Sequence, residues 1–144
     1  MQGAIKILLV DDYDVIRMAL RRILELEEDF EVIGDVSNAE EALTQLEIIS
    51  PDIVIMDIKL PGMDGIELTR QLKRKKPYCE VIILSVFNEY LPEALEAGAS
   101  GYFQKDIKGQ ELSEAIRRIH NGEIIIAEEI IDPTLDKSRD TYDD

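Results

Sequence analysis

The sequence has 144 residues, of which 45% are hydrophobic and 33% are charged. This length and composition are typical of one globular domain with a sizeable core and exclude a largely disordered chain. The formal net charge of −15 disfavours binding to nucleic acids and anionic membranes, because both partners are polyanions.

Short apolar runs alternate with amphipathic segments along the first 122 residues. The runs predict strands buried on both faces, at Ile5–Val10, Phe30–Val36, Ile53–Met56, Val81–Leu84 and Gly101–Gln104. Each run is followed by apolar residues at helical spacing, which in the first such segment are Ile16, Leu20, Ile23 and Leu24. Strands and helices are therefore expected to alternate along the chain.

Capping and helix-breaking residues bound the predicted helices. Asn38 is followed three residues later by Glu41, a pattern typical of a helix N-terminus. Asp64, in the turn Leu60–Gly65, which is rich in Pro and Gly, is predicted to cap the third helix. Pro92 suits the first turn of the fourth helix, and Gly98 suits its end.

This alternation predicts an α/β fold, a doubly wound five-stranded parallel sheet of order 2-1-3-4-5 with a flavodoxin-like arrangement. Ligands of such sheets bind at the carboxyl ends of the strands, beside the point where the winding reverses. That point lies between the first and third strands. We expect the domain to span residues 1–122, followed by a linker or acidic tail over residues 123–144. Within it, Glu123–Ile131 is apolar enough to pack against the domain as an extra turn or linker.

Polar residues stand where the predicted strands end. Asp11 and Asp12 follow the first strand, Asp57 the third, Ser85 the fourth and Lys105 the fifth. Clustered carboxylates repel one another without a cation, and oxygen ligands suit Mg²⁺, with Mn²⁺ as a substitute. The Asp57 carboxylate is then placed to attack a phosphoryl donor, while the hydroxyl and the amine contact phosphoryl oxygens. The predicted site is a magnesium-dependent phosphoryl acceptor.

Other functions fit the residues less well. A single Asp at a strand end is an ordinary turn residue, and only the combination favours phosphoryl chemistry. The sequence has no glycine-rich loop of the kind that cradles nucleotide phosphates. A flavodoxin-like cofactor binder needs a Ser/Thr/Gly loop after the first strand, where this chain has DDYD. A small-molecule phosphatase needs a substrate pocket or cap, for which the short loops leave no obvious room.

Four segments carry a more specific signal: ILLVDDYDVIR, PDIVIMDIKLPGMDGIEL, VIILS and GASGYFQKD. Through them the chain resembles, from about Ala4 to Gly122, the receiver domain of bacterial two-component response regulators. Further segments are similar to receivers of the NarL/FixJ type, which precede a C-terminal helix-turn-helix domain. These segments are EVIGDVSNAEEAL, ILSVFNEY, EAGASGYFQKDI and ELSEAIRRIHNGE.

The resemblance implies a role for each acidic residue. Asp57 corresponds to the phosphoacceptor, with a sensor histidine kinase as the phosphoryl donor. Asp11 and Asp12 correspond to the acidic pair that binds Mg²⁺, and the backbone carbonyl of Lys59 is implied as a further ligand. The activity expected is self-phosphorylation and self-dephosphorylation at Asp57 with Mg²⁺, in place of conventional enzymatic turnover.

The resemblance also implies a switch. Ser85 and Lys105 correspond to the hydroxyl and the lysine that assist phosphoryl transfer, and Tyr102 to an aromatic switch residue. When Ser85 moves to bond a phosphoryl oxygen, Tyr102 is expected to turn inward and fill the space behind it, which shifts a two-state equilibrium.

The chain departs from the family pattern at several positions. Lys59 and Phe87 occupy variable positions that flank the phosphoryl group, so the lifetime of the phosphorylated state is not implied by the resemblance. Val86 stands where many receivers have a smaller residue, which is expected to hinder access to the acyl phosphate. Asp106 stands where many have proline, so a cis peptide bond is not expected there.

The resemblance implies partners as well. They are a sensor histidine kinase, a second copy of the chain in a homodimer formed on phosphorylation, and DNA, contacted through a C-terminal effector domain outside these 144 residues. This segment itself is expected to bind neither nucleic acid nor membrane, and a cytoplasmic location is implied. The alternative is a stand-alone receiver that acts as a protein-docking adaptor.

Overall fold

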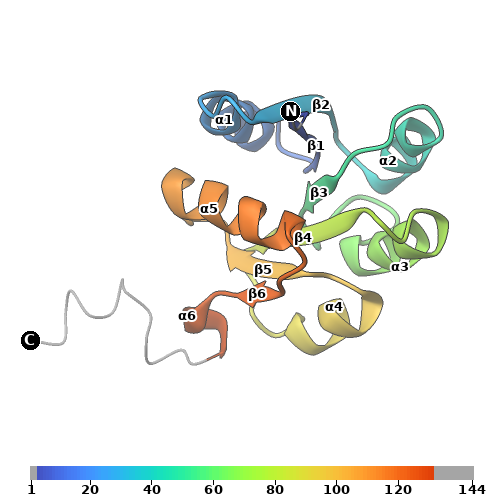
Figure 1. Cartoon of the computed structure of the whole chain (residues 1–144). Coiled ribbons are helices and arrows are strands. Elements are labelled where there is room, and N and C mark those ends of the chain that lie inside the picture. Colours follow the sequence, from blue (N-terminus) through green and yellow to red (C-terminus); the bar gives the residue numbers. More distant parts are fainter. Residues whose placement is uncertain (1–2, 132–144) are drawn as a thin grey trace, which may run out of the picture.

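The computed structural model describes residues 3–131, so the acidic tail predicted over residues 132–144 lies outside the described residues. One parallel sheet of order β2-β1-β3-β4-β5-β6 forms the centre of the molecule (Figure 1). Its strands are β1 (Ile5–Val10), β2 (Phe30–Val36), β3 (Ile53–Met56), β4 (Glu80–Ser85), β5 (Gly101–Gln104) and β6 (Ile125–Ile126). The order of the first five strands confirms the predicted topology.

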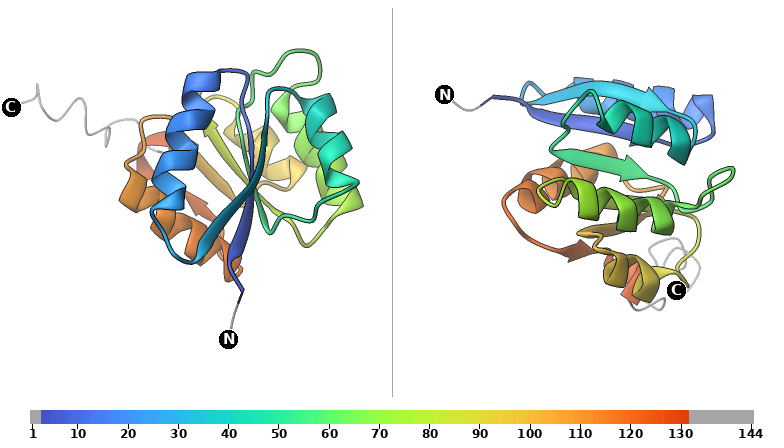
Figure 2. Two further views of the ribbon diagram at one scale, coloured as in Figure 1. Left: turned by 90° about the horizontal axis from the view of Figure 1, so that it is seen from above. Right: turned by 90° about the vertical axis from the view of Figure 1, so that its right-hand side faces the viewer.

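Helices cover both faces of the sheet. They are α1 (Asp14–Glu25), α2 (Ala39–Leu46), α3 (Gly65–Lys75), α4 (Leu91–Ala97), α5 (Gly109–His120) and the short α6 (Glu128–Ile131). Helices α1 and α5 cover one face, and α2, α3 and α4 cover the other (Figures 1 and 2). None of the helices in residues 3–131 combines the length and the apolar character needed to cross a membrane.

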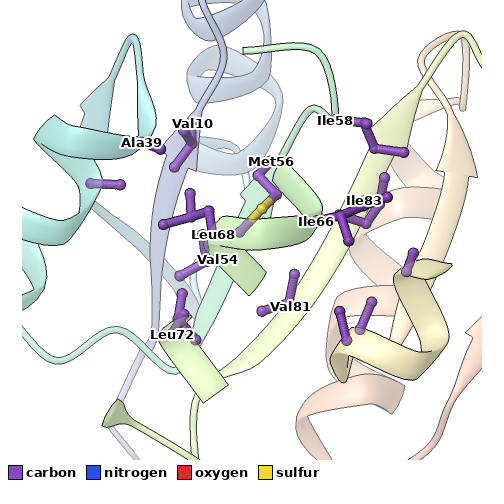
Figure 3. Close-up of a cluster of buried hydrophobic side chains, with 14 of the residues drawn as sticks. Val10, Ala39, Val54, Met56, Ile58, Ile66, Leu68, Leu72, Val81 and Ile83 are labelled. Carbon is purple, nitrogen blue, oxygen red and sulfur yellow. The ribbon is translucent and has the colours of Figure 1, made fainter. Parts of the chain in front are cut away.

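The central strands are apolar because both of their faces are buried. In β1, Ile7 and Leu9 belong to the cluster completed by α1 and α5, whereas Leu8 and Val10 belong to the cluster on the opposite face. The same alternation runs along β3, and Figure 3 shows its Val54 and Met56 side chains beside those of α3. Successive side chains of a strand point to opposite faces, so a strand covered on both sides reads as a continuous apolar run.

The predicted helix ends are also confirmed. The Asn38 side chain accepts a hydrogen bond from the Glu41 amide at 2.8 Å, and the Asp64 side chain accepts one from the Glu67 amide at 2.9 Å. Each bond satisfies a backbone donor that the helix leaves without a partner. Gly98 ends α4 with φ +113°, a left-handed conformation that favours glycine.

The sequence did not predict the last two elements. Strand β6 pairs in parallel with β5, the Ala127 amide donates to the Tyr102 carbonyl at 3.0 Å, and Ile130 is buried in the α2–α4 side of the core. Residues 123–131, expected as an extra turn or linker after a five-stranded sheet, are therefore packed against the domain and add a sixth strand. At two and four residues, β6 and α6 are too short for periodicity to reveal them.

Candidate functional site

The three predicted carboxylates meet at the carboxyl edge of the sheet. Strands β1 and β3 are neighbours with Val10 opposite Met56, so Asp11 and Asp57 leave the two strands at the same level. Backbone hydrogen bonding continues past the strands, because the Asp57 amide donates to the Val10 carbonyl at 3.1 Å. One carboxylate oxygen each from Asp11, Asp12 and Asp57 lie within 4.8 Å of one another. The edge therefore carries an acidic cluster of the kind that the sequence predicted.

Lys105 comes from the end of β5 and bridges two of these carboxylates. Its Nζ lies 2.8 Å from Asp57 Oδ2 and 3.0 Å from Asp11 Oδ2. The side chains of Lys105, Asp57 and Asp11 are only 16%, 7% and 5% exposed, so solvent screens these ion pairs little. Burial lowers the pKa of Lys105, but the hydrogen bonds and charges of Asp57 and Asp11 outweigh it and leave that pKa raised. The amine is therefore a fixed positive charge at neutral pH.

One buried carboxylate oxygen of the cluster lacks a hydrogen-bond partner and fits a metal ion. Asp12 Oδ1 is buried and has no hydrogen-bond partner among the described residues. A buried oxygen without a donor or a cation is costly, and one amine does not neutralise three carboxylates. All donor atoms here are oxygens, as Mg²⁺ prefers, so the residues present fit a hard dication.

The Lys59 side chain contacts two aromatic rings. Its Nζ lies 4.6 Å from the centre of the Tyr90 ring and 5.6 Å from that of Phe87, both in the segment between β4 and α4. The backbone carbonyl of Lys59, which the resemblance implies as a metal ligand, stays a prediction. The amine and the two rings lie beside one another on the surface of the domain, where such cation–π contacts are weak.

Gly65 holds the Asp57 backbone in place. The Gly65 amide donates to the Ile58 carbonyl at 2.8 Å, and a Cβ atom added to Gly65 would lie 2.1 Å from the Asp57 carbonyl oxygen. Only glycine lets the start of α3 approach so closely. From the sequence, Gly65 is expected only to belong to the turn that precedes this helix. A glycine in the first turn of a predicted helix, where other residues form helix better, is the signal that could have identified it.

Ser85 and Tyr102 both contact the backbone of Phe87. Ser85 Oγ accepts a hydrogen bond from the Phe87 amide at 3.0 Å, and the Tyr102 hydroxyl donates to the Phe87 carbonyl. Both side chains are fully buried. Burial raises the pKa of Tyr102 to about 12, so the hydroxyl keeps its proton at neutral pH. The switch hypothesis starts from an outward tyrosine, whereas the ring in this structure already points inward.

The peptide bond before Asp106 is trans, as expected, because no peptide bond among residues 3–131 is cis. Val86, expected to hinder access to the acyl phosphate, is 67% exposed and follows the end of β4. Its side chain therefore lies on the surface beside the site and is not part of the core.

Comparison with known proteins identifies the class of this domain. The family model of the response regulator receiver domain matches residues 7–117, so the chain belongs to that family. A solved two-component response regulator of the LuxR family, from Aurantimonas sp. SI85-9A1, superposes with a TM-score of 0.84 at 34% identity. The match covers 90% of this chain and 94% of that one. The predicted family and fold are confirmed.

Two curated relatives from Bacillus subtilis (strain 168) extend the comparison. The transcriptional regulatory protein LnrK is 36% identical over 128 residues, which are 88% of this chain and 58% of LnrK. The transcriptional regulatory protein LiaR is 36% identical over 137 residues, which are 94% of this chain and 65% of LiaR. This chain therefore spans less than two thirds of the length of these two relatives.

Proposed function

We propose that this chain is a phosphorylation-controlled receiver and that Asp57 accepts the phosphoryl group. The observation that carries the proposal is the Lys105 amine, 2.8 Å from Asp57 and 3.0 Å from Asp11, beside the unpartnered oxygen of Asp12. A carboxylate among these groups is a nucleophile whose product, an acyl phosphate, has a cation ready to contact its oxygens. Membership of the receiver family supports the same chemistry.

The proposed ligands of Mg²⁺ are Asp11, Asp12, Asp57 and the backbone carbonyl of Lys59, and Mn²⁺ is an expected substitute. When bound, the ion neutralises charge on the carboxylates and on the transferring phosphoryl group. The buried, unpartnered Asp12 Oδ1 supports this assignment, because a cation there removes the cost of burying that oxygen.

In the proposed transfer, the donor is a phosphohistidine of a sensor histidine kinase. A carboxylate oxygen of Asp57 forms a bond to phosphorus while the P–N bond of the donor breaks. The leaving nitrogen keeps the electron pair and takes a proton from solvent. Lys105 then exchanges its hydrogen bond to Asp57 for one to a phosphoryl oxygen, and the Ser85 hydroxyl donates to another. Attack of water on phosphorus later breaks the O–P bond and restores the carboxylate.

The proposed output is a change around Ser85, Phe87 and Tyr102. Because Ser85 Oγ accepts from the Phe87 amide, and the Tyr102 hydroxyl donates to the Phe87 carbonyl, moving Ser85 changes the surroundings of Tyr102. The switch thus rearranges a hydrogen-bonded loop around a ring that is already inward, and this replaces the inward swing expected from the sequence.

The remaining partners are part of the same proposal. The relatives LnrK and LiaR are named transcriptional regulatory proteins, which supports DNA binding through an effector domain outside this sequence. The net charge of −15 supports assigning DNA contacts elsewhere. A homodimer on phosphorylation and a cytoplasmic location follow from the family resemblance.

We also propose that the receiver domain extends to Ile131, because Ile130 packs in its core. The docking adaptor remains the alternative, and the length of the native reading frame after residue 144 distinguishes the two.

The test is intact-mass spectrometry after incubation with acetyl phosphate and Mg²⁺. One phosphoryl adduct is expected in the parent protein and none in Asp57→Asn or after removal of divalent ions. Asp64→Asn is the matched control, because Asp64 is an exposed helix cap and Asn caps helices equally well. An adduct that persists in Asp57→Asn, or that forms without divalent ions, would contradict the proposal.

A further inference from the structure

A partly buried arginine contacts the loop that carries the acidic pair. Arg17, in the second turn of α1, donates from Nη1 to the backbone carbonyl of Asp11 at 2.6 Å. Its Nε donates to Asp35 Oδ1 at 3.1 Å, and its Nη2 donates to Asp14 Oδ1. The Arg17 side chain is 14% exposed, much less than a typical arginine. One guanidinium therefore joins the acidic loop, the start of α1 and the end of β2.

These contacts fix the peptide between the two aspartates. The carbonyl that Arg17 holds belongs to the peptide bond joining Asp11 to Asp12. The backbone amide and the carboxylate of Asp11 are held by hydrogen bonds as well. The amide donates to the Val36 carbonyl at 3.1 Å, and Oδ1 accepts from the Tyr13 amide at 2.9 Å. Since a peptide group is planar, holding its carbonyl also sets the direction in which Asp12 leaves it.

We infer that Arg17 is a positioning residue for the proposed magnesium site. By anchoring the Asp11–Asp12 peptide, it keeps both carboxylates turned toward Asp57, within the 4.8 Å that their oxygens span. Asp35 in turn holds the guanidinium, so β2 supports a site to which it contributes no ligand. The inference rests on the proposed function, because it assumes that the acidic cluster binds Mg²⁺.

The sign of the expected effect separates positioning from simple electrostatics. Arg17 is a cation close to a site for a dication, and like charges repel. If charge were its only influence, Arg17→Gln would tighten Mg²⁺ binding. If Arg17 positions the loop, the same substitution weakens binding despite removing a positive charge. Groups that orient metal ligands typically change affinity by about 10-fold or more when they are removed.

Arg21 provides a matched control on the same helix. Its Nη2 donates to Asp35 Oδ2 at 2.6 Å, and its Nη1 to Glu25 at 3.2 Å. Among the described hydrogen bonds, those of Arg21 reach Val32, Asp35 and Glu25 and not the loop of the acidic pair. Arg21→Gln therefore removes one positive charge, as Arg17→Gln does, and removes one hydrogen bond to Asp35. It leaves the Asp11 carbonyl bonded to Arg17.

The experiment is a Mg²⁺ titration followed by amide chemical shifts in ¹⁵N–¹H NMR spectra, which also report whether each variant is folded. We expect the Mg²⁺ dissociation constant to rise about 10-fold in Arg17→Gln, and to be unchanged or lower in Arg21→Gln. Arg17→Lys is expected to fall between parent and Arg17→Gln, because an ammonium group can donate to the Asp11 carbonyl but not to all three acceptors at once. Urea titrations of the same variants measure stability separately.

Each outcome decides between the hypotheses. Equal or tighter binding in Arg17→Gln, with parent binding intact, overturns the positioning role and leaves the magnesium site standing. A parent protein that binds no Mg²⁺ refutes the proposed site itself. Equal weakening in Arg21→Gln also overturns the inference, because it assigns the effect to Asp35, the acceptor that both arginines share. If Arg17→Gln does not fold, the change in Mg²⁺ affinity of Arg17→Lys is the test. Weaker binding supports the inference, and equal or tighter binding refutes it.

Discussion

Replacing Gly65 by alanine tests whether close backbone packing positions the phosphoacceptor. Helix propensity alone predicts that Gly65→Ala stabilises the domain by up to about 1 kcal/mol, since Ala is the better helix former. The structure predicts the opposite, because the new Cβ would lie 2.1 Å from the Asp57 carbonyl oxygen and 3.0 Å from the Ile58 Cα. Ordinary contacts of a Cβ atom begin at 3.4 Å, so the backbone has to move. Overpacking of this kind costs about 1–3 kcal/mol, and the upper half of that range is expected because both partners are backbone.

The assay is urea denaturation followed by circular dichroism, combined with the rate of adduct formation from acetyl phosphate. We expect Gly65→Ala to unfold at a lower urea concentration and to be phosphorylated more slowly, because the Asp57 peptide is displaced. Gly62→Ala is the control in the same loop: φ is +76° but no atom lies within 4 Å of the added Cβ. It is expected to lose about 1 kcal/mol through backbone strain alone and to keep its phosphorylation rate. A Gly65→Ala protein as stable as the parent would refute the reasoning.

Three further predictions concern Ile130, Tyr102 and Lys105. In urea denaturation, Ile130→Ala is expected to lower the free energy of unfolding by about 2 kcal/mol, the low end for a buried Ile. Ile131→Ala is expected to change it by no more than about 0.5 kcal/mol, because Ile130 is 6% exposed and Ile131 is 64% exposed. Equal effects would contradict a receiver domain that extends past residue 122. Burial raises the pKa of Tyr102 from 10.0 to about 12, so the neutral hydroxyl stabilises the fold fully below pH 10, and this stabilisation is lost as the pH rises toward 12. Urea denaturation at pH 9–12 should therefore show a smaller fall in the free energy of unfolding in Tyr102→Phe than in the parent. Lys105→Gln is expected to bind Mg²⁺ more tightly in the NMR titration, because it removes the amine that neutralises Asp57 and Asp11. Weaker binding would argue against competition between the amine and the ion.

The fold could be predicted because burial leaves a direct mark on the sequence. Strands covered on both faces are continuous apolar runs, and the predicted strand Val81–Leu84 differs from the observed β4 only by one residue at each end. The caps at Asn38 and Asp64 involve residues three apart in the chain, so they too are visible locally. Strand β6 was missed because two residues carry no period, and its pairing depends on the exposed edge of β5.

The site was predictable to the extent that topology alone brings its residues together. Asp11 and Asp57 follow strands that the fold makes neighbours, so their proximity needs no detail of side-chain packing. The contributions of Arg17 and Gly65 depend on such detail. An arginine on an amphipathic helix is usually a solvated surface residue, and only the structure shows its guanidinium against the Asp11 carbonyl. Likewise, only atomic distances show that α3 leaves no room for a Cβ at Gly65.

A chain of hydrogen bonds joins Ser85 to the last described segment. Ser85 Oγ accepts from the Phe87 amide, the Phe87 carbonyl accepts from the Tyr102 hydroxyl, and the Tyr102 carbonyl accepts from the Ala127 amide. Tyr102 thus contacts the β4–α4 loop through its side chain and residues 123–131 through its backbone. Under the proposed function, a movement of Ser85 toward the phosphoryl group changes the geometry of the first of these bonds. Residues 123–131, whose short strand the sequence did not predict, therefore connect the strand that carries Tyr102 to whatever follows Ile131, and under the proposed function they would transmit the phosphorylation state.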